Sequence, residues 1–207
     1  MANVSSKFWI TDTINIYDEI DVAPNRLSSI IPKVYQANIT KLNLKNQIIS
    51  YSDFLFLSSN VENIDMFCTT VKAGNDSIVP LEKLVNGLPK IKSLWFFDNS
   101  SASSITTTTF KKLLENPHFF KCAEIVMQNL PEKFDIETFF SYAKKNQTTK
   151  IFLHFNDSTS EAYKTRLETF IDLVVASQTH NYLPPLIHSP RIDDERWQKI
   201  TSLYHTY

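Results

Sequence analysis

Apolar and polar residues alternate over five short stretches of the chain, each with the spacing apolar-x-x-apolar-x-apolar. Alternation of this kind is typical of a β-strand that buries one face. The second apolar position of the five stretches falls at residues 42, 64, 94, 125 and 153, at intervals of 22, 30, 31 and 28 residues. The apolar sets are Ile39/Leu42/Leu44, Val61/Ile64/Met66, Ile91/Leu94/Phe96, Cys122/Ile125/Met127 and Ile151/Leu153/Phe155. The pattern predicts five repeated strands.

A segment with helical periodicity follows each predicted strand after a polar loop. Pro80 introduces the second segment, and proline is favoured in the first turn of a helix because its missing N–H costs nothing there. The hydroxyls of residues 106–109 are candidates to cap the third segment. The apolar residues that set the periodicity are Tyr51, Phe54, Leu55 and Leu57; Leu81, Leu84, Val85 and Leu88; Phe110, Leu113 and Leu114; Phe134, Ile136, Phe139, Phe140 and Ala143; and, between Ser160 and Ser177, Tyr163, Leu167, Phe170, Ile171, Val174 and Val175.

Strand–loop–helix units repeated in this way favour a right-handed coil whose strands stack in parallel. Residues 91–99 (IKSLWFFDN) match the spacing L-x-x-L-x-L-x-x-N, and the chain thereby resembles the leucine-rich-repeat family. The other units hold Gln47, Thr69, Leu130 and Ser158 where that spacing has asparagine. We therefore expect an α/β fold, a leucine-rich-repeat-like right-handed solenoid of about five strand–loop–helix units with a parallel sheet. An ordinary α/β sheet of unrelated units is the alternative.

The flanks of the repeats predict caps, because the terminal units of such an array need covering. Residues 1–38 hold one or two strand-like segments and a short helix that Pro32 ends. Residues 39–178 hold the strand–helix repeats, and residues 179–207 hold a proline-containing extended linker and a C-terminal capping helix. We expect residues 1–207 to form a single repeat domain.

Several short stretches resemble a large, lineage-expanded family of nematode proteins with F-box-associated repeat regions. They are residues 49–57 (ISYSDFLFL), 78–84 (IVPLEKL), 105–109 (ITTTT), 130–135 (LPEKFD) and 161–167 (EAYKTRL). The resemblance implies an adaptor or substrate-recognition domain, with ubiquitin-ligase components among its partners. The short helical box that docks F-box proteins on the ligase scaffold is not evident before Lys33.

Only two of the 207 residues are glycine, Gly74 and Gly87. Average usage would give roughly fourteen. The chain therefore contains none of the glycine-dependent loops that wrap a phosphate, approach a dinucleotide or expose a nucleophilic serine, and no cofactor is expected. Asn, Asp, Ser and Pro must form the turns, since Asn and Asp also tolerate left-handed backbone. Gly87 is expected to take a left-handed conformation at a helix end.

Charge and hydropathy argue against nucleic acid and against a membrane as partners. The formal net charge is −1 and no basic stripe is visible, which argues against nucleic acid. No apolar stretch reaches the roughly 18 residues of a membrane span, and the first residues lack the pattern of a secretory signal. We therefore expect a cytoplasmic protein, with the nucleus as the alternative, whose Cys68 and Cys122 are reduced thiols.

Candidate catalytic residues are sparse. The five histidines show no metal-ligand spacing. Asp98, Asp157 and Glu161 follow strand ends, where sites of α/β enzymes often lie, but acidic residues are also common in such loops. A hydrolase of unrecognised type is therefore the least favoured reading, and we assign no catalytic residue and no metal ligand.

Residues between the inward apolar positions point out from the opposite face of the sheet. Phe67, Trp95 and Phe97 lie on adjacent predicted strands, and aromatic side chains on an open face are typical of a binding hot spot. We expect a non-enzymatic protein–protein interaction module whose binding residues are Phe67, Trp95, Phe97, Asp65, Val126, Gln128 and His154. Two alternatives remain open. The terminal segments cover this face, or a second copy covers it in a self-associating structural protein.

Overall fold

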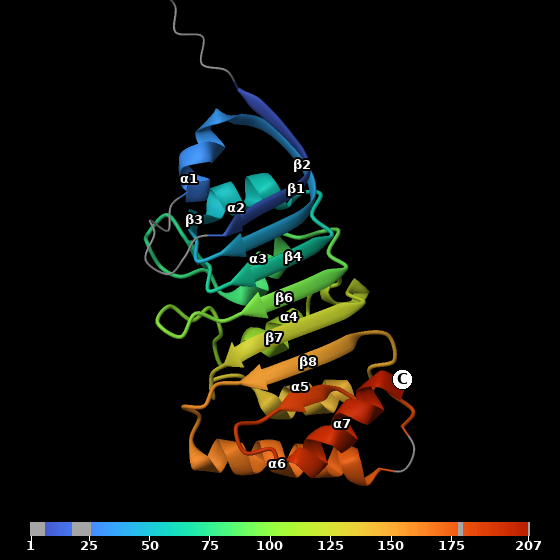
Figure 1. Ribbon diagram of the computed structural model, residues 1–207. Coiled ribbons are helices and arrows are strands. Elements are labelled where there is room, and N and C mark those ends of the chain that lie inside the picture. Colours follow the sequence, from blue (N-terminus) through green and yellow to red (C-terminus); the bar gives the residue numbers. More distant parts are fainter. Residues whose placement is uncertain (1–6, 18–25, 178–179, 207) are drawn as a thin grey trace, which may run out of the picture.

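The computed structural model describes residues 7–17, 26–177 and 180–206, which form an α/β fold around a parallel sheet (Figure 1). The sheet has seven strands in the order β1-β2-β4-β6-β7-β8-β9, and every neighbouring pair is parallel. The strands are β1 (Phe8–Tyr17), β2 (Val34–Lys45), β4 (Asn63–Phe67), β6 (Ser93–Phe97), β7 (Glu124–Leu130), β8 (Lys150–Phe155) and β9 (Leu186–His188). The order in space follows the order in the chain, so each new strand adds to the same edge.

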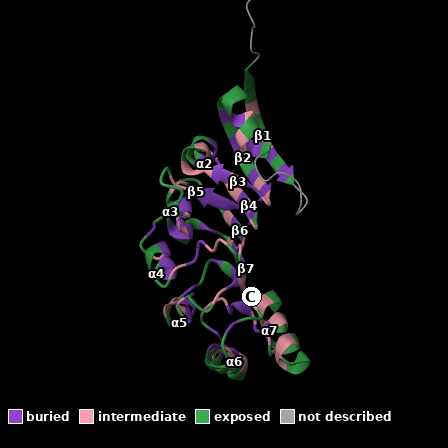
Figure 2. Ribbon diagram, turned by 90° about the vertical axis from the view of Figure 1, so that its left-hand side faces the viewer, coloured by how far each residue is buried: buried purple, intermediate pink, exposed green. Residues whose placement is uncertain are grey.

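The helices lie mainly on one side of this sheet. They are α1 (Arg26–Ile30), α2 (Tyr51–Ser58), α3 (Leu81–Asn86), α4 (Thr109–Leu113), α5 (Ile136–Ala143), α6 (Glu161–Ala176) and α7 (Asp194–Thr206), with short 3-10 turns η1 (Ile31–Lys33) and η2 (Phe119–Lys121). Figure 2 shows α2 to α5 along one face of the sheet and α7 on the opposite side. A small parallel pair, β3 (Ile48–Ser50) and β5 (Thr70–Lys72), lies on the side of α2 and α3.

All five predicted helical segments are confirmed as α2 to α6. Side-chain caps start three of them, because Ser50, Asp135 and Ser160 each accept a bond from the backbone N–H three residues on. The predicted threonine hydroxyls do bond to the backbone at the start of α4. Thr106 Oγ1 accepts the Thr108 N–H at 3.3 Å, and Thr109 Oγ1 accepts the Thr106 N–H at 2.9 Å, although Thr108 itself makes no side-chain cap bond. The Thr109 hydroxyl also donates to Glu82 Oε2 of α3 at 2.8 Å, so it has a tertiary partner as well as a local one.

The register of the sheet follows the apolar spacing, with one correction. Leu42, Ile64, Leu94 and Ile125 lie side by side on β2, β4, β6 and β7, as their spacing predicts. On β8 the equivalent residue is Ile151 rather than Leu153. A slip by two residues keeps the same side chains on the buried face, so alternation alone cannot distinguish the two registers.

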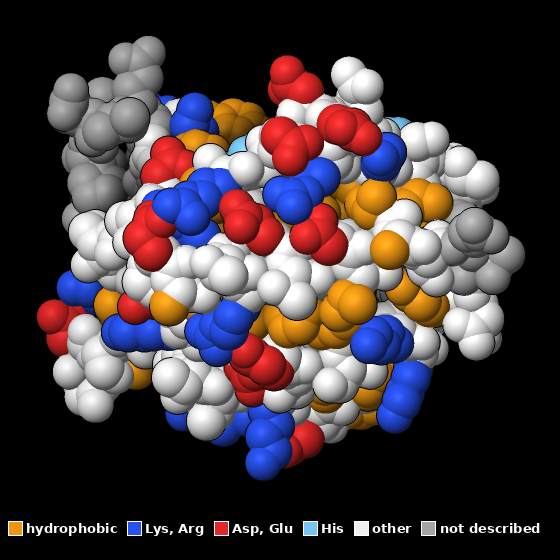
Figure 3. All heavy atoms as spheres, turned by 90° about the horizontal axis from the view of Figure 1, so that it is seen from below, with side chains coloured by type: hydrophobic (Ala, Val, Ile, Leu, Met, Phe, Trp, Pro, Cys, Tyr) orange, Lys and Arg blue, Asp and Glu red, His pale blue; other side chains and the backbone are white. Residues whose placement is uncertain are grey.

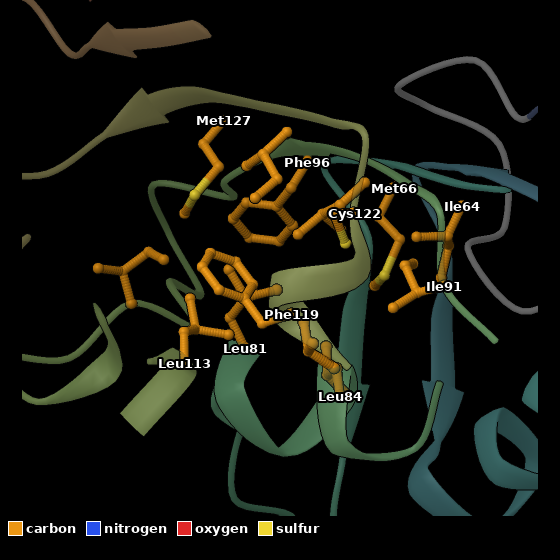
Figure 4. Packing of buried hydrophobic residues seen from close by; sticks show 14 of the residues in the cluster. Ile64, Met66, Leu81, Leu84, Ile91, Phe96, Leu113, Phe119, Cys122 and Met127 are labelled. Atoms are coloured by element: carbon orange, nitrogen blue, oxygen red, sulfur yellow. The ribbon is translucent and has the colours of Figure 1, made fainter. Parts of the chain in front are cut away.

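The main core fills the space between the sheet and the helices. Figure 4 shows Met66, Phe96 and Met127 of the sheet near Leu81 and Leu113, which come from α3 and α4. These apolar residues are all buried. Aromatic rings extend this core toward α5. Phe110 meets Phe119, Phe134 and Phe139 at centroid distances of 6.1, 5.3 and 5.4 Å.

Both cysteines are free thiols, as expected. Cys122 is buried in the core, and this burial raises the pKa of its thiol to about 12. Cys68 is only half-buried, at the end of β4. No helix of the described residues combines the length and the hydropathy needed to cross a membrane.

Asparagine and aspartate take most of the left-handed backbone positions among the described residues, as the composition predicts. The residues with positive φ are Asp12 (72°), Asn46 (55°), Cys68 (48°), Asp76 (64°) and Asn129 (58°). The prediction for Gly87 is wrong, because its φ is −78°. Close approach explains that glycine instead, since an added Cβ would lie 2.7 Å from Leu55 Cδ2 and 3.2 Å from the Leu84 carbonyl oxygen.

The two flanks differ from the expected caps in detail. The N-terminal flank holds one described strand, β1, and the predicted short helix, α1 with η1, while β2 begins at Val34, so residue 39 lies inside β2. The proline-containing linker leads into β9, a strand that the sequence pattern did not indicate. The C-terminal end of the molecule, seen in Figure 3, intersperses acidic and basic side chains. Its ion pairs include Arg166–Glu137 at 2.7 Å and Arg196–Asp172 at 2.9 Å.

Cys68 offers a test of the turn chemistry. It follows Phe67 on β4 just as Asn46 follows the paired Lys45 on β2, and it is left-handed without being glycine, asparagine or aspartate. We expect Cys68→Gly to have a free energy of unfolding about 1 kcal/mol higher than Cys68→Ala, because a left-handed backbone penalises Cβ. Urea denaturation of both variants measures the difference. Equal stability of the two variants would contradict this assignment.

Candidate functional site

The face of the sheet that points away from α2 to α5, called the outward face below, carries every residue that the sequence predicted for binding. It is the face turned toward the viewer in Figure 1. Two rows of side chains cross it. The central row is Asn43, Asp65, Trp95, Val126 and Phe152, and the carboxyl-end row begins Lys45, Phe67, Phe97 and Gln128. His154 follows on β8, where its Nδ1 accepts a 3.3 Å bond from the Asn129 N–H.

The C-terminal helix covers one half of the outward face. On α7, Trp197 packs edge-on against His188 of β9 with ring centroids 5.1 Å apart, and Lys150 of β8 lies 5.6 Å from the ring centroid of Tyr204. Val126 of β7 is only 4 % exposed. The prediction of Val126 as an accessible binding residue is therefore wrong.

In the part of the chain that the structure describes, no element covers the other half, over β2, β4 and β6, and we call it the open half. Its aromatic residues are accessible. Phe67 is 36 % exposed and Trp95 is 44 % exposed. Phe97 is half-buried because it stacks on Phe67 with centroids 4.3 Å apart. The Lys45 ammonium lies 5.2 Å from the Phe67 ring centroid, close enough for a cation–π contact.

Hydrogen bonds fix the orientation of Trp95. Its indole Nε1 donates to Glu124 Oε2 on β7 at 2.8 Å, and the Ser93 hydroxyl donates to the same oxygen at 3.3 Å. Asp65 is paired with Trp95 across the two strands, and partial burial raises the pKa of its carboxyl. The structure thus brings Asp65, Phe67, Trp95 and Phe97 together on one accessible surface.

Gln128 and His154 lie at the border of the open half. Both are half-buried. His154 stacks on His188 at a centroid distance of 4.9 Å, so one side of its ring is occupied. Burial, and to a lesser extent the proximity of His154, lowers the pKa of His188, while Asp157 has a smaller opposite effect. These histidines form contacts between β8, β9 and α7, and they add little to the exposed surface of the open half.

The acidic residues at strand ends serve local structure. Asp98 is buried, its Oδ1 accepts a 3.2 Å bond from the Ser104 N–H, and burial raises the pKa of its carboxyl. Glu161 pairs with Lys164 at 3.1 Å and with Arg191. Within residues 7–17, 26–177 and 180–206 there is no group of three His, Cys, Asp or Glu side chains placed to hold a metal ion.

A hollow lies where β2, β4 and β6 end, next to the open half. Its volume is about 590 Å³, and Phe67, Cys68, Thr70, Lys72 and Asn99 are among its lining residues. Burial, with a smaller contribution from Asp98, raises the pKa of the Cys68 thiol, while Lys45 lowers it. The net effect keeps the thiol protonated, which disfavours its use as a nucleophile.

Sequence reasoning missed several residues that shape this surface. Phe152 belongs to the central outward row, and its alternation with buried residues could have placed it there. Glu124, which orients Trp95, and Trp197, which covers the other half, gave no such signal. Glu124 contacts Trp95, which lies 29 residues away in the sequence, and Trp197 contacts His188, which belongs to another element.

Comparison of the chain with family models, curated proteins and solved structures found no match. Its function therefore has to be inferred from the outward face itself. Three features of that face bear on function: exposed aromatic rings, an indole held in one orientation, and a carboxylate next to it.

The lowered pKa of His188, caused mainly by burial, makes stability depend on pH. The pKa of His188 is lower in the folded chain than the ordinary value of 6.5, and that of His180 shifts in the same direction. The unfolded chain therefore binds more protons below about pH 6.5, and the free energy of unfolding should fall as the pH decreases through that value.

We expect His188→Phe, which keeps a ring against Trp197, to lose less stability than the wild type between about pH 7.5 and about pH 5.5. Urea denaturation at the two pH values measures this loss. His205→Gln, at an exposed position on α7, the helix that carries Trp197, is the control and should behave like the wild type. An unchanged loss in His188→Phe would rule out His188 as a contributor.

Proposed function

We propose that this protein is a non-enzymatic interaction module that binds a partner protein on the open half of its outward face. One observation carries the proposal. A parallel sheet normally has both faces covered, whereas here Phe67 and Trp95 stand exposed on the strands that α7 does not reach. Exposed apolar clusters on a folded protein are typical of binding surfaces.

The order of these side chains favours binding. The indole of Trp95 is held by Glu124, and Phe67 is stacked on Phe97. Such side chains lose little rotational freedom when a partner covers them, so more of the contact energy is available for affinity. Trp and aromatic residues generally also dominate the energetics of interfaces.

We further propose that the strand–helix units form a leucine-rich-repeat-like right-handed coil. The support is the strand order, which follows the chain without reversal, and the position of α2 to α5 on one side. Coils of stacked units commonly bind partners on an extended sheet face. The free thiols Cys68 and Cys122 support a reducing compartment, the cytoplasm or the nucleus.

The partner class follows from the resemblance to F-box-associated nematode proteins. We propose an adaptor that selects substrates, with ubiquitin-ligase components among its partners. Affinity purification followed by mass spectrometry tests this role. Repeated recovery of ligase scaffold subunits would support it, and their consistent absence from the purified material would count against it.

Trp95→Ala tests the binding surface. We expect this variant to lose partner capture at least about tenfold, because hot-spot aromatics contribute 2 kcal/mol or more. The fold should survive, since the indole is partly exposed and lies outside the main core. Capture from cell extract measures the loss, and circular dichroism verifies folding.

Phe56→Ala is the matched control. Phe56 is 38 % exposed but lies on α2, on the covered side of the sheet, so capture should be unaffected. Equal capture by Trp95→Ala and the wild type would refute the proposal. Size-exclusion chromatography with light scattering separates it from self-association, because a tight dimer that Trp95→Ala abolishes would favour the structural alternative.

A further inference from the structure

A shallow hollow on the open half lies between β2, β4 and β6. Its volume is about 290 Å³, and Asn43, Asn63, Asp65, Ser93 and Trp95 line it. Trp95 supplies an aromatic wall, and Asp65 supplies a carboxylate from the neighbouring strand. The hollow thus combines a negative charge, an aromatic ring and side-chain amides.

The carboxylate of Asp65 has no partner of its own. Among the described residues it makes no hydrogen bond and no ion pair. Two lysines of β2 lie diagonally across from it, Lys41 opposite Asn63 and Lys45 opposite Phe67. Lys45 is placed over the Phe67 ring, and Lys41 forms no ion pair with Asp65. Burial alone raises the pKa of Asp65, so the group has lost water without gaining a cation.

The amide and indole groups around Asp65 favour a flat cation with several donors. The indole N–H is already used by Glu124, which leaves the ring of Trp95 as the binding element and adds a second negative charge beside it. Asn43 Nδ2 donates to Asn15 Oδ1 at 2.6 Å, so the Asn43 Oδ1 is left to accept. A guanidinium group stacks on aromatic rings and donates to carboxylates through two parallel bonds, whereas an ammonium group is a more strongly hydrated point charge.

We propose that this hollow binds an arginine side chain of the partner protein, with the guanidinium group stacked on Trp95 and bonded to Asp65. The inference rests on the proposed function and names the chemistry of the partner. The apolar stack of Phe67 and Phe97 lies next to the hollow along the same strands. The favoured partner segment therefore presents arginine close to an apolar residue.

Nuclear magnetic resonance of the full chain labelled with nitrogen-15 tests the proposal. The chain has three tryptophans, so the indole N–H signals of Trp9 and Trp197 are internal controls for that of Trp95. We expect N-acetyl-arginine methylamide to move the Trp95 signal in a saturating, millimolar titration. The neutral isostere N-acetyl-citrulline methylamide should move it far less, and N-acetyl-lysine methylamide should bind more weakly than the arginine compound.

Asp65→Asn removes the charge and keeps the shape of the side chain. We expect it to weaken binding of the arginine compound about fivefold. Asp76→Asn is the matched control, because Asp76 is an exposed acid outside the hollow, and its affinity should equal that of the wild type. Equal shifts with the citrulline compound, or equal affinity in Asp65→Asn, would overturn the proposal. The proposal would also be overturned if the Trp95 signal moved only with protein concentration, because a second copy of the chain would then occupy the outward face.

Partner capture separates a failure of this proposal from a failure of the proposed function. If Trp95→Ala loses capture and Asp65→Asn does not, the open half binds a partner without arginine in the hollow, and only this inference fails. If both variants capture normally, the open half is not the binding surface, and the proposed function fails as well. Loss of capture in both variants, with Asp76→Asn unaffected, supports both.

Discussion

The structure depends on one constraint, which is that the helical connections α2 to α5 return on the same side of the sheet. Parallel strands need such crossovers, and a helix in each crossover packs on the strands it joins. Leu42, Ile64, Leu94 and Ile125 form the buried row that these helices cover. The same arrangement leaves the opposite face uncovered unless another segment of the chain packs on it. Only α7 is seen there, and it reaches β8 and β9 but leaves β4 and β6 open.

The sequence predicts the architecture well because its apolar spacing is local information. Strand β6 (Ser93–Phe97) and the helix after Pro80 both follow from a few neighbouring residues. The errors arise where the register or the local conformation depends on contacts with another element. The β8 register is one of two that bury the same side chains, and Gly87 lies close to Leu55 and to the Leu84 carbonyl without a left-handed φ.

The candidate site was predictable in part for the same reason. Alternation places Asp65, Phe67, Trp95 and Phe97 on one face, and the parallel register then makes them neighbours. Alternation gives no information about which part of that face remains open. Val126 has the same local pattern as Trp95, yet it lies on the half where α7 packs. The orientation of the indole likewise depends on Glu124, which belongs to a different strand.

The agreement between strand order and chain order has a consequence for how a local loosening spreads through the sheet. Each strand of the main sheet pairs only with the strands next to it in that order. Loosening at the β9 end, where histidines contact α7, is separated from Asp65 and Trp95 by β7 and β8. Tyr204 of α7 nevertheless lies near enough to Glu124 to be affected by its charge, so the helix that covers one half of the face also neighbours the residue that holds the Trp95 indole.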